Sequence, residues 1–362
     1  MIKKNGCLFD VGEKDLQILY SNPETFWKGV TKIGKGAFEK LNNFEAIEIP
    51  ESIEEIDEYA FNGCENLRIV NLAQSIKTLK RGVFQNCINL QELELPKLVY
   101  FIESEAFYGC KNLKKITLQS NVVLESAVFG DCENLTEIIG SEDIRSFGDY
   151  AFMNCKKLKT IIPQKNCAHL SEGVFAGCES LNGEIQDGVR IIGKNAFLGC
   201  KSLKNAIVPE SVFEIEDFAF KGCKNLKVVL IPDSVEDFGL EVFEGCDNLK
   251  FIFASNNLKK MLPPNLKKKV VDLKFTPEKF LDLPIELFGD KKLVGTLVDT
   301  VKLGIFEQVY EKHHLFEEYK AYCIKLLGAV SLKIKNPNLT AKDIANFIKP
   351  AEKSKLIKNI KS

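Results

Sequence analysis

A short pattern of apolar residues recurs along the first 254 residues of the chain. In each copy a phenylalanine is followed three places later by a cysteine and, after three more, by a leucine, as in AFNGCENL at residues 60–67. The phenylalanines are Phe38, Phe61, Phe84, Phe107, Phe129, Phe152, Phe175, Phe197, Phe220 and Phe243. Neighbouring copies are 23 residues apart, except for two steps of 22. A fixed period of this length predicts a solenoid, in which each repeat packs on its neighbours.

Each repeat has three parts. The piece AFxxCxxL places apolar residues three apart, which predicts a single tight helical turn. A strand-like piece such as LELELP follows, often ended by a proline, which cannot donate to a strand ladder. The last piece, such as SIEEI, carries apolar residues eight and five places before the next phenylalanine. No repeat can bury these residues alone, so we expect phenylalanine, leucine and cysteine columns inside the stack.

The repeat resembles that of the BspA-like, or Treponema-type, leucine-rich repeat family, which runs roughly LxxIxIPxxVxxIxxxAFxxCxxL. The match covers about residues 16–254. The resemblance implies a right-handed, curved solenoid with a parallel sheet on its inner face. It also implies a binding role rather than a catalytic one, since members are often surface proteins that adhere to host or neighbouring cells.

The chain divides into three parts. Residues 1–30 are expected to form an N-terminal capping repeat, because terminal repeats must cover the open apolar end of a stack. Residues 31–258 form the solenoid of about ten repeats of 22–23 residues. Beyond Phe253 the period stops and apolar residues follow helical spacing, so residues 259–362 are predicted to be a small, basic all-α domain with a frayed tail.

The two halves differ in charge. Residues 1–254 contain 28 basic and 38 acidic residues, a net charge of −10, whereas residues 255–362 contain 21 basic and 12 acidic residues, a net charge of +9. A basic domain suggests nucleic acid, but all of its basic residues are lysines. Arginine makes most bidentate base contacts, so a nucleic-acid partner is not expected.

The chain has 12 cysteines, nine of them in the repeat column. Aligned residues of a parallel stack point the same way rather than at one another, so we expect buried free thiols that act as small hydrophobes. The sequence has no CxxC pair of the kind that binds zinc. Free thiols, together with the lack of a signal-peptide pattern or an 18-residue apolar span, predict a cytoplasmic protein, with a surface location left open by the family resemblance.

No motif with a catalytic mechanism is present. The chain has three histidines and contains no HExxH, GxSxG or P-loop sequence. We therefore expect a protein that is not an enzyme, with no cofactor, no metal site and no small-molecule substrate.

The residue ten places after each phenylalanine is predicted to point outward from the sheet. It is polar in the first four repeats and apolar in the next six. The six apolar residues are Ile139, Ile162, Ile185, Ile207, Leu230 and Phe253. As an exposed stripe they would form a partner-binding surface. The alternative is that some strands are shifted by one residue and turn these side chains inward, which Glu184, at an expected inward position, indicates.

The sequence thus predicts a non-enzymatic scaffold that binds a protein partner on the inner sheet face. Two alternatives stay open. One is a surface adhesin exported without a recognisable signal peptide. The other is a solenoid that displays a helical nucleic-acid-binding or effector domain.

Overall fold

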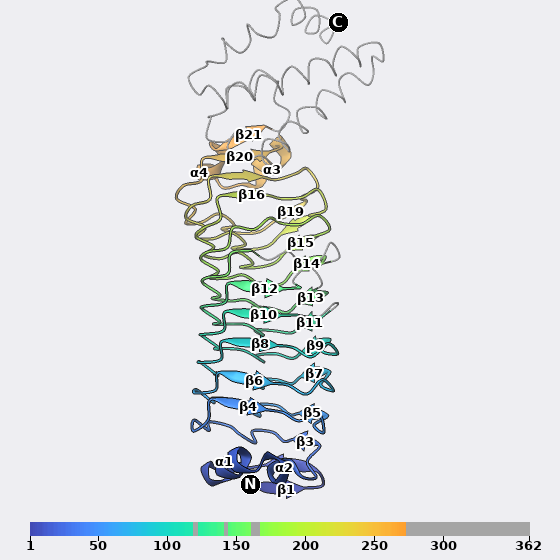
Figure 1. The fold of residues 1–362 in the computed structure, drawn as a ribbon. Coiled ribbons are helices and arrows are strands. Elements are labelled where there is room, and N and C mark those ends of the chain that lie inside the picture. The colour runs from blue at the N-terminus through green and yellow to red at the C-terminus, as the bar shows by residue number, and fades with distance from the viewer. Residues whose placement is uncertain (119–121, 141–143, 161–166, 273–362) are drawn as a thin grey trace, which may run out of the picture. The chain divides into compact units, whose positions relative to one another are not determined.

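The computed structural model describes residues 1–118, 122–140, 144–160 and 167–272. The chain divides into two compact units, residues 1–250 and the part from Phe251 onward. In the first unit the repeats stack along one axis as a parallel-strand solenoid (Figure 1). Most of the predicted C-terminal all-α domain lies outside the described residues.

Two short helices close the N-terminal end of the stack. The elements there are β1 (Ile2–Lys4), β2 (Cys7–Phe9), α1 (Glu13–Ser21), α2 (Pro23–Trp27) and β3 (Lys32–Ile33). The antiparallel pair β1–β2 joins the solenoid through parallel pairing of β2 with β3. The ring centroids of Phe26 and Trp27 lie 6.3 and 6.4 Å from that of Phe38, so α2 covers the first ring of the phenylalanine column.

In seven repeats of the first unit, the strand-like piece forms the longer strands of the solenoid. They are β4 (Ala46–Glu48), β6 (Ile69–Asn71), β8 (Glu92–Glu94), β10 (Lys115–Thr117), β12 (Glu137–Ile139), β16 (Asn205–Ile207) and β18 (Val228–Leu230). We call them the long-strand sheet. Strands β4–β6, β8–β10–β12 and β16–β18 pair in parallel. From β4 to β16 the middle residue of each strand is buried and its neighbours are more exposed, as predicted.

A second row of short parallel strands, which was not predicted from the sequence, runs beside the first (Figure 1). It consists of β3, β5 (Glu55–Ile56), β7 (Thr78–Leu79), β9 (Phe101–Ile102), β11 (Val123–Leu124), β13 (Ser146–Phe147), β14 (His169–Leu170), β15 (Ile191–Ile192), β17 (Glu214–Ile215) and β19 (Asp237–Phe238). These strands pair in parallel in three sections, β3–β5, β7–β9–β11–β13 and β14–β15–β17–β19. We call it the short-strand sheet. Each strand has two residues, too few for alternating polarity to reveal it in the sequence.

The second unit begins with β20 (Phe251–Ala254), followed by α3 (Asn256–Met261), α4 (Pro264–Lys267) and β21 (Val270–Asp272). Strands β20 and β21 pair in parallel.

The AFxxCxxL piece forms two successive turns rather than the predicted helical turn. In the second repeat the Cys64 N–H donates to the Phe61 carbonyl at 3.2 Å, and the Leu67 N–H donates to the Cys64 carbonyl at 3.1 Å. Within the first of these turns, Gly63 has φ +71°, in the left-handed region. This residue stops a right-handed helix from continuing and turns the chain toward the next strand.

The predicted core columns are present. Along the ten repeat phenylalanines, successive ring centroids lie 4.8 to 5.9 Å apart. The nine repeat cysteines are buried and free. Each thiol donates to the backbone carbonyl of the phenylalanine one repeat earlier, at 3.0 to 3.3 Å. Cysteine therefore supplies both apolar volume and a donor that joins neighbouring repeats, and burial raises the pKa of the Cys64 thiol to about 12.

Candidate protein-binding surface

The outward side of the long-strand sheet begins with a polar section. Glu48 and Asn71 are aligned between β4 and β6, and Glu94 and Thr117 between β8 and β10. The first three are exposed and Thr117 is half-buried. These residues have the outward register that the sequence predicted.

Two of the predicted apolar site residues reach solvent on this side. Ile139 follows Thr117 in the same row of the ladder and is 38% exposed. Ile207 ends β16 and is half-buried. These two side chains are the accessible part of the predicted stripe.

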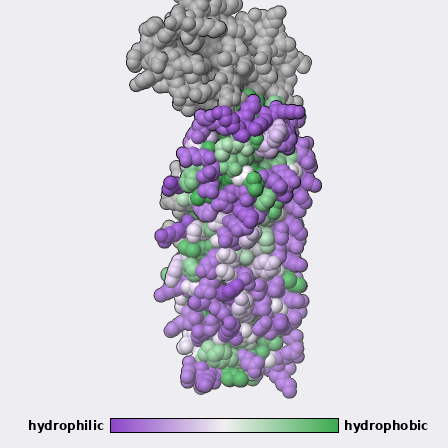
Figure 2. All heavy atoms as spheres, turned by 180° about the vertical axis from the view of Figure 1, so that it is seen from behind, coloured by the Kyte–Doolittle hydropathy of each residue, from purple (hydrophilic) through white to green (hydrophobic). Residues whose placement is uncertain are grey.

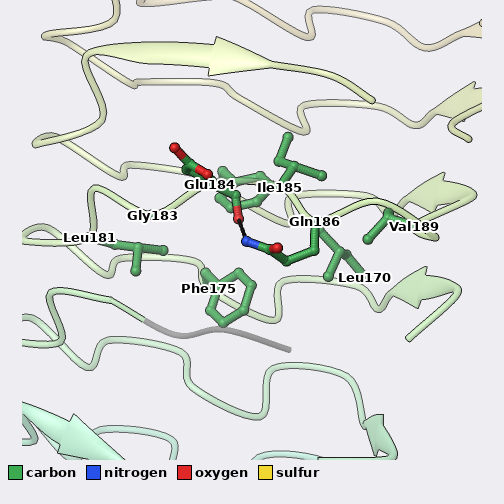
Figure 3. Close-up of a pocket in the computed structure, with 9 residues that line it drawn as sticks. Leu170, Phe175, Leu181, Gly183, Glu184, Ile185, Gln186 and Val189 are labelled. Atoms are coloured by element: carbon green, nitrogen blue, oxygen red, sulfur yellow. Dashed lines mark hydrogen bonds between the residues drawn. The ribbon is translucent and has the colours of Figure 1, made fainter. Parts of the chain in front are cut away.

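Ile185 departs from its expected outward position. Residues 183–186 form no strand, and Ile185 is 8% exposed. It lines a cavity of about 20 Å³ together with core side chains that include Phe175 and Leu181 (Figure 3). Glu184, in contrast, is exposed. A buried carboxylate is costly, so this repeat turns Glu184 outward and Ile185 inward, the one-residue shift left open by the sequence.

Leu230 and Phe253 are also closed to solvent, at 4% and 0% exposure. Leu230 shares the outward row with Ile207, but all three residues of β18 are buried. Phe253 belongs to the second unit, and Ile162 lies outside the described residues. The predicted six-residue stripe is therefore not one continuous open surface.

A column of basic residues precedes the long strands, one place after the repeat leucine. Its exposed members are Arg68, Lys114, Lys159, Lys204, Lys227 and Lys250. In the last three repeats the lysines are adjacent, since the Lys227 N–H donates to the Lys204 carbonyl at 2.7 Å and the Lys250 N–H to the Lys227 carbonyl at 2.9 Å. None of these three ammonium groups forms an ion pair within the part of the chain that the structure describes. This column was not predicted, although its period is visible in the sequence.

Other sides of the solenoid differ in character. The side behind that of Figure 1 is mainly hydrophilic, with apolar residues divided into small areas (Figure 2), as is usual for protein surfaces.

Among the described residues there is no group of three or more His, Cys, Asp or Glu side chains that could hold a metal ion. Nor do those residues include a helix long and apolar enough to cross a membrane.

The repeat, its two parallel sheets and its buried columns define a leucine-rich-repeat solenoid. The family model described as "BspA type Leucine rich repeat region" matches in six copies, over residues 24–132, 102–184 and 182–267. The chain belongs to this family.

A similar solved structure supports this fold. A leucine-rich repeat protein from Bacteroides ovatus is 28% identical, with a TM-score of 0.53 over 67% of this chain and 70% of the other. The T. pallidum leucine-rich repeat protein is also 28% identical, with a TM-score of 0.42 over 50% of this chain and 85% of the other. No curated protein matches the chain.

Proposed function

We propose that this protein is a non-enzymatic scaffold that binds a protein partner on the outward side of its long-strand sheet. The observation that carries the proposal is the exposure of Ile139 at the end of an ordered outward row. Parallel strands hold such side chains about 4.8 Å apart, so the surface is ordered before a partner arrives. Little conformational entropy is then lost on binding.

The chemistry of this surface favours a partner with apolar and acidic side chains. Ile139 and Ile207 offer apolar contact on separate strands. Lys204 and Lys227 supply positive charge beside β16 and β18. Buried apolar contacts provide most of the affinity of such an interface, and the charges favour correct partners and fast association.

The double variant Ile139→Glu with Ile207→Glu is expected to lose at least tenfold in affinity for the partner, or about 1.4 kcal/mol. Carboxylates at these positions would oppose apolar contact and repel acidic groups. The test is capture from lysate with the wild-type full chain, then titration of the recovered protein against each variant. Ile69→Glu, 56% exposed at the polar end of the same sheet, is the control and should bind normally. Unchanged binding by the double variant, with native circular dichroism, would contradict the proposal.

We also propose that the protein works in a reducing compartment, the cytoplasm. Nine buried thiols donate hydrogen bonds between repeats. A thiol that was oxidised while the protein was exported would have no proton to donate. Protease treatment of intact cells should leave the protein whole, with a known surface protein cut as the control. Removal of the protein by the protease would favour a surface adhesin instead.

A further inference from the structure

We propose that the short-strand sheet carries a separate binding surface for an acidic linear peptide with apolar side chains. This surface, which we call the aromatic patch, consists of Leu98, Tyr100, Phe101 and Val123. The patch lies on a different sheet from Ile139. Its proposed role does not depend on the function proposed above.

The aromatic patch is exposed on an ordered framework. Leu98 and Tyr100 are 53% and 56% exposed, and Phe101 and Val123 are half-buried. Phe101 and Val123 are direct neighbours in the β9–β11 ladder. The Val123 N–H also donates to the Tyr100 carbonyl at 2.9 Å. Backbone hydrogen bonding between the two repeats therefore holds Val123 next to both Tyr100 and Phe101.

The patch interrupts a row that is polar on both sides. Thr78 is aligned with Phe101 on one side, and Ser146 with Val123 on the other. A solvent-facing position that is polar in neighbouring repeats needs no apolar residue for folding. Exposed clusters of large apolar side chains usually mark contact sites.

Cations surround the patch. The Tyr100 N–H donates to the Lys77 carbonyl at 3.2 Å, which places Lys77 one strand before the patch. Arg145 lies one strand beyond it, since its N–H donates to the Val122 carbonyl at 2.9 Å. Lys97 adjoins Leu98 in the turn. All three cations are exposed, and within the described ranges none of them is in an ion pair.

The nearest carboxylates of β9 and β11 are already engaged. Glu103 forms an ion pair with Lys80 at 3.1 Å. Glu125 accepts hydrogen bonds from the backbone N–H and the hydroxyl of Ser104, both at 2.9 Å. Among the described residues of β9, β11 and their adjoining turns, the free charge beside the patch is therefore positive and complements an acidic ligand.

A peptide fits this chemistry better than a nucleic acid. Leu98 and Val123 are aliphatic, which suits aliphatic or aromatic side chains rather than base stacking alone. The surrounding residues 1–254 carry a net charge of −10, which opposes a long polyanionic backbone. A short peptide needs only the local positive charge.

The proposal is tested with a fluorescein-labelled peptide of about ten residues, made of Asp and Glu around a central Leu-Phe pair. Fluorescence anisotropy with the full chain should show saturable binding that weakens with salt. Tyr100→Glu should weaken it at least about tenfold, and Lys77→Glu with Arg145→Glu should do the same. Leu240→Glu, at an exposed position outside both sheets, is the matched control and should bind normally. A peptide with Lys in place of its acidic residues should not bind.

Two results would overturn the proposal. One is the absence of saturation by the wild-type chain up to about 1 mM peptide. The other is equal binding by Tyr100→Glu and wild type. If Tyr100→Glu loses its native circular dichroism, Tyr100→Ser replaces it, with the same tenfold loss expected. A labelled oligothymidine that binds in place of the peptide and is lost in Tyr100→Ser would assign the patch to nucleic acid instead.

Discussion

Phe152→Ala is expected to lower the free energy of unfolding by about 3–5 kcal/mol, the usual range for a buried phenylalanine. Phe152 is 0% exposed and stacks on Phe129 and Phe175, with ring centroids 5.5 and 5.9 Å away. Phe147 adds an edge contact at 5.7 Å. Because repeats above and below fix these neighbours, the cavity can collapse only in part. Urea unfolding followed by circular dichroism measures the loss.

Leu240→Ala is the control for this variant, because Leu240 is 71% exposed and its truncation should change stability by less than about 0.5 kcal/mol. Hydrogen exchange adds a second readout. Each repeat packs on its neighbours, so protection should fall in the repeats next to Phe152 and persist near Phe61. Uniform loss of protection along the stack would show that the solenoid unfolds as one unit.

Sequence periodicity was sufficient to predict the core of this fold. The spacing of phenylalanine and cysteine identified both buried columns because identical residues at a fixed period must stack. The outward register at Glu94, Thr117 and Ile139 also followed, since alternation along a strand decides which side chain is buried. What the pattern did not show was the bond from each thiol to the preceding repeat, which depends on three-dimensional spacing.

The surface was harder to predict than the core. Ile185 has the same sequence position as Ile139, yet it points inward because Glu184 occupies the position that would otherwise fill the core. The aromatic patch was missed for a related reason. Phe101 begins β9 of the short-strand sheet and Tyr100 directly precedes it. These short strands were not recognised in the sequence, so the outward direction of the two side chains could not be predicted.

Raising the pH above about 9 is expected to destabilise the solenoid steeply. Eight buried repeat cysteines have a pKa raised above the ordinary value of 9.0: Cys64, Cys87, Cys110, Cys132, Cys155, Cys178, Cys200 and Cys223. Burial is the main cause at seven of them, while at Cys223 the interaction with Cys246 comes first and burial second. The thiols stay protonated in the folded chain and ionise in the unfolded one.

The direction of the effect follows from proton binding. Each thiol stabilises the fold fully below its unfolded pKa, and this contribution is lost as pH rises toward the folded value, because the unfolded state releases its proton first. At pH 10 the loss is about 1.4 kcal/mol for each thiol, or roughly 11 kcal/mol for eight if the stack unfolds as one unit. This is comparable to the whole stability of a typical domain, about 5–15 kcal/mol. Urea unfolding at several pH values between about 7 and 10, in the presence of a reductant, measures the loss.

Cys155→Ser provides the control that assigns this effect to the thiols. Serine does not ionise in this range, so unfolding of the variant at high pH should release up to one proton fewer than unfolding of the wild type. Its free energy of unfolding should therefore fall less between pH 9 and pH 10 than that of the wild type, by about 1 kcal/mol, if Cys155 unfolds with the measured transition. The comparison uses slopes, because the substitution also lowers stability at neutral pH by about 1–3 kcal/mol if the hydroxyl pairs poorly with the Phe129 carbonyl. Equal slopes for wild type and Cys155→Ser, in a transition that unfolds the repeat of Cys155, would mean that Cys155 already ionises in the folded chain, which is incompatible with its burial.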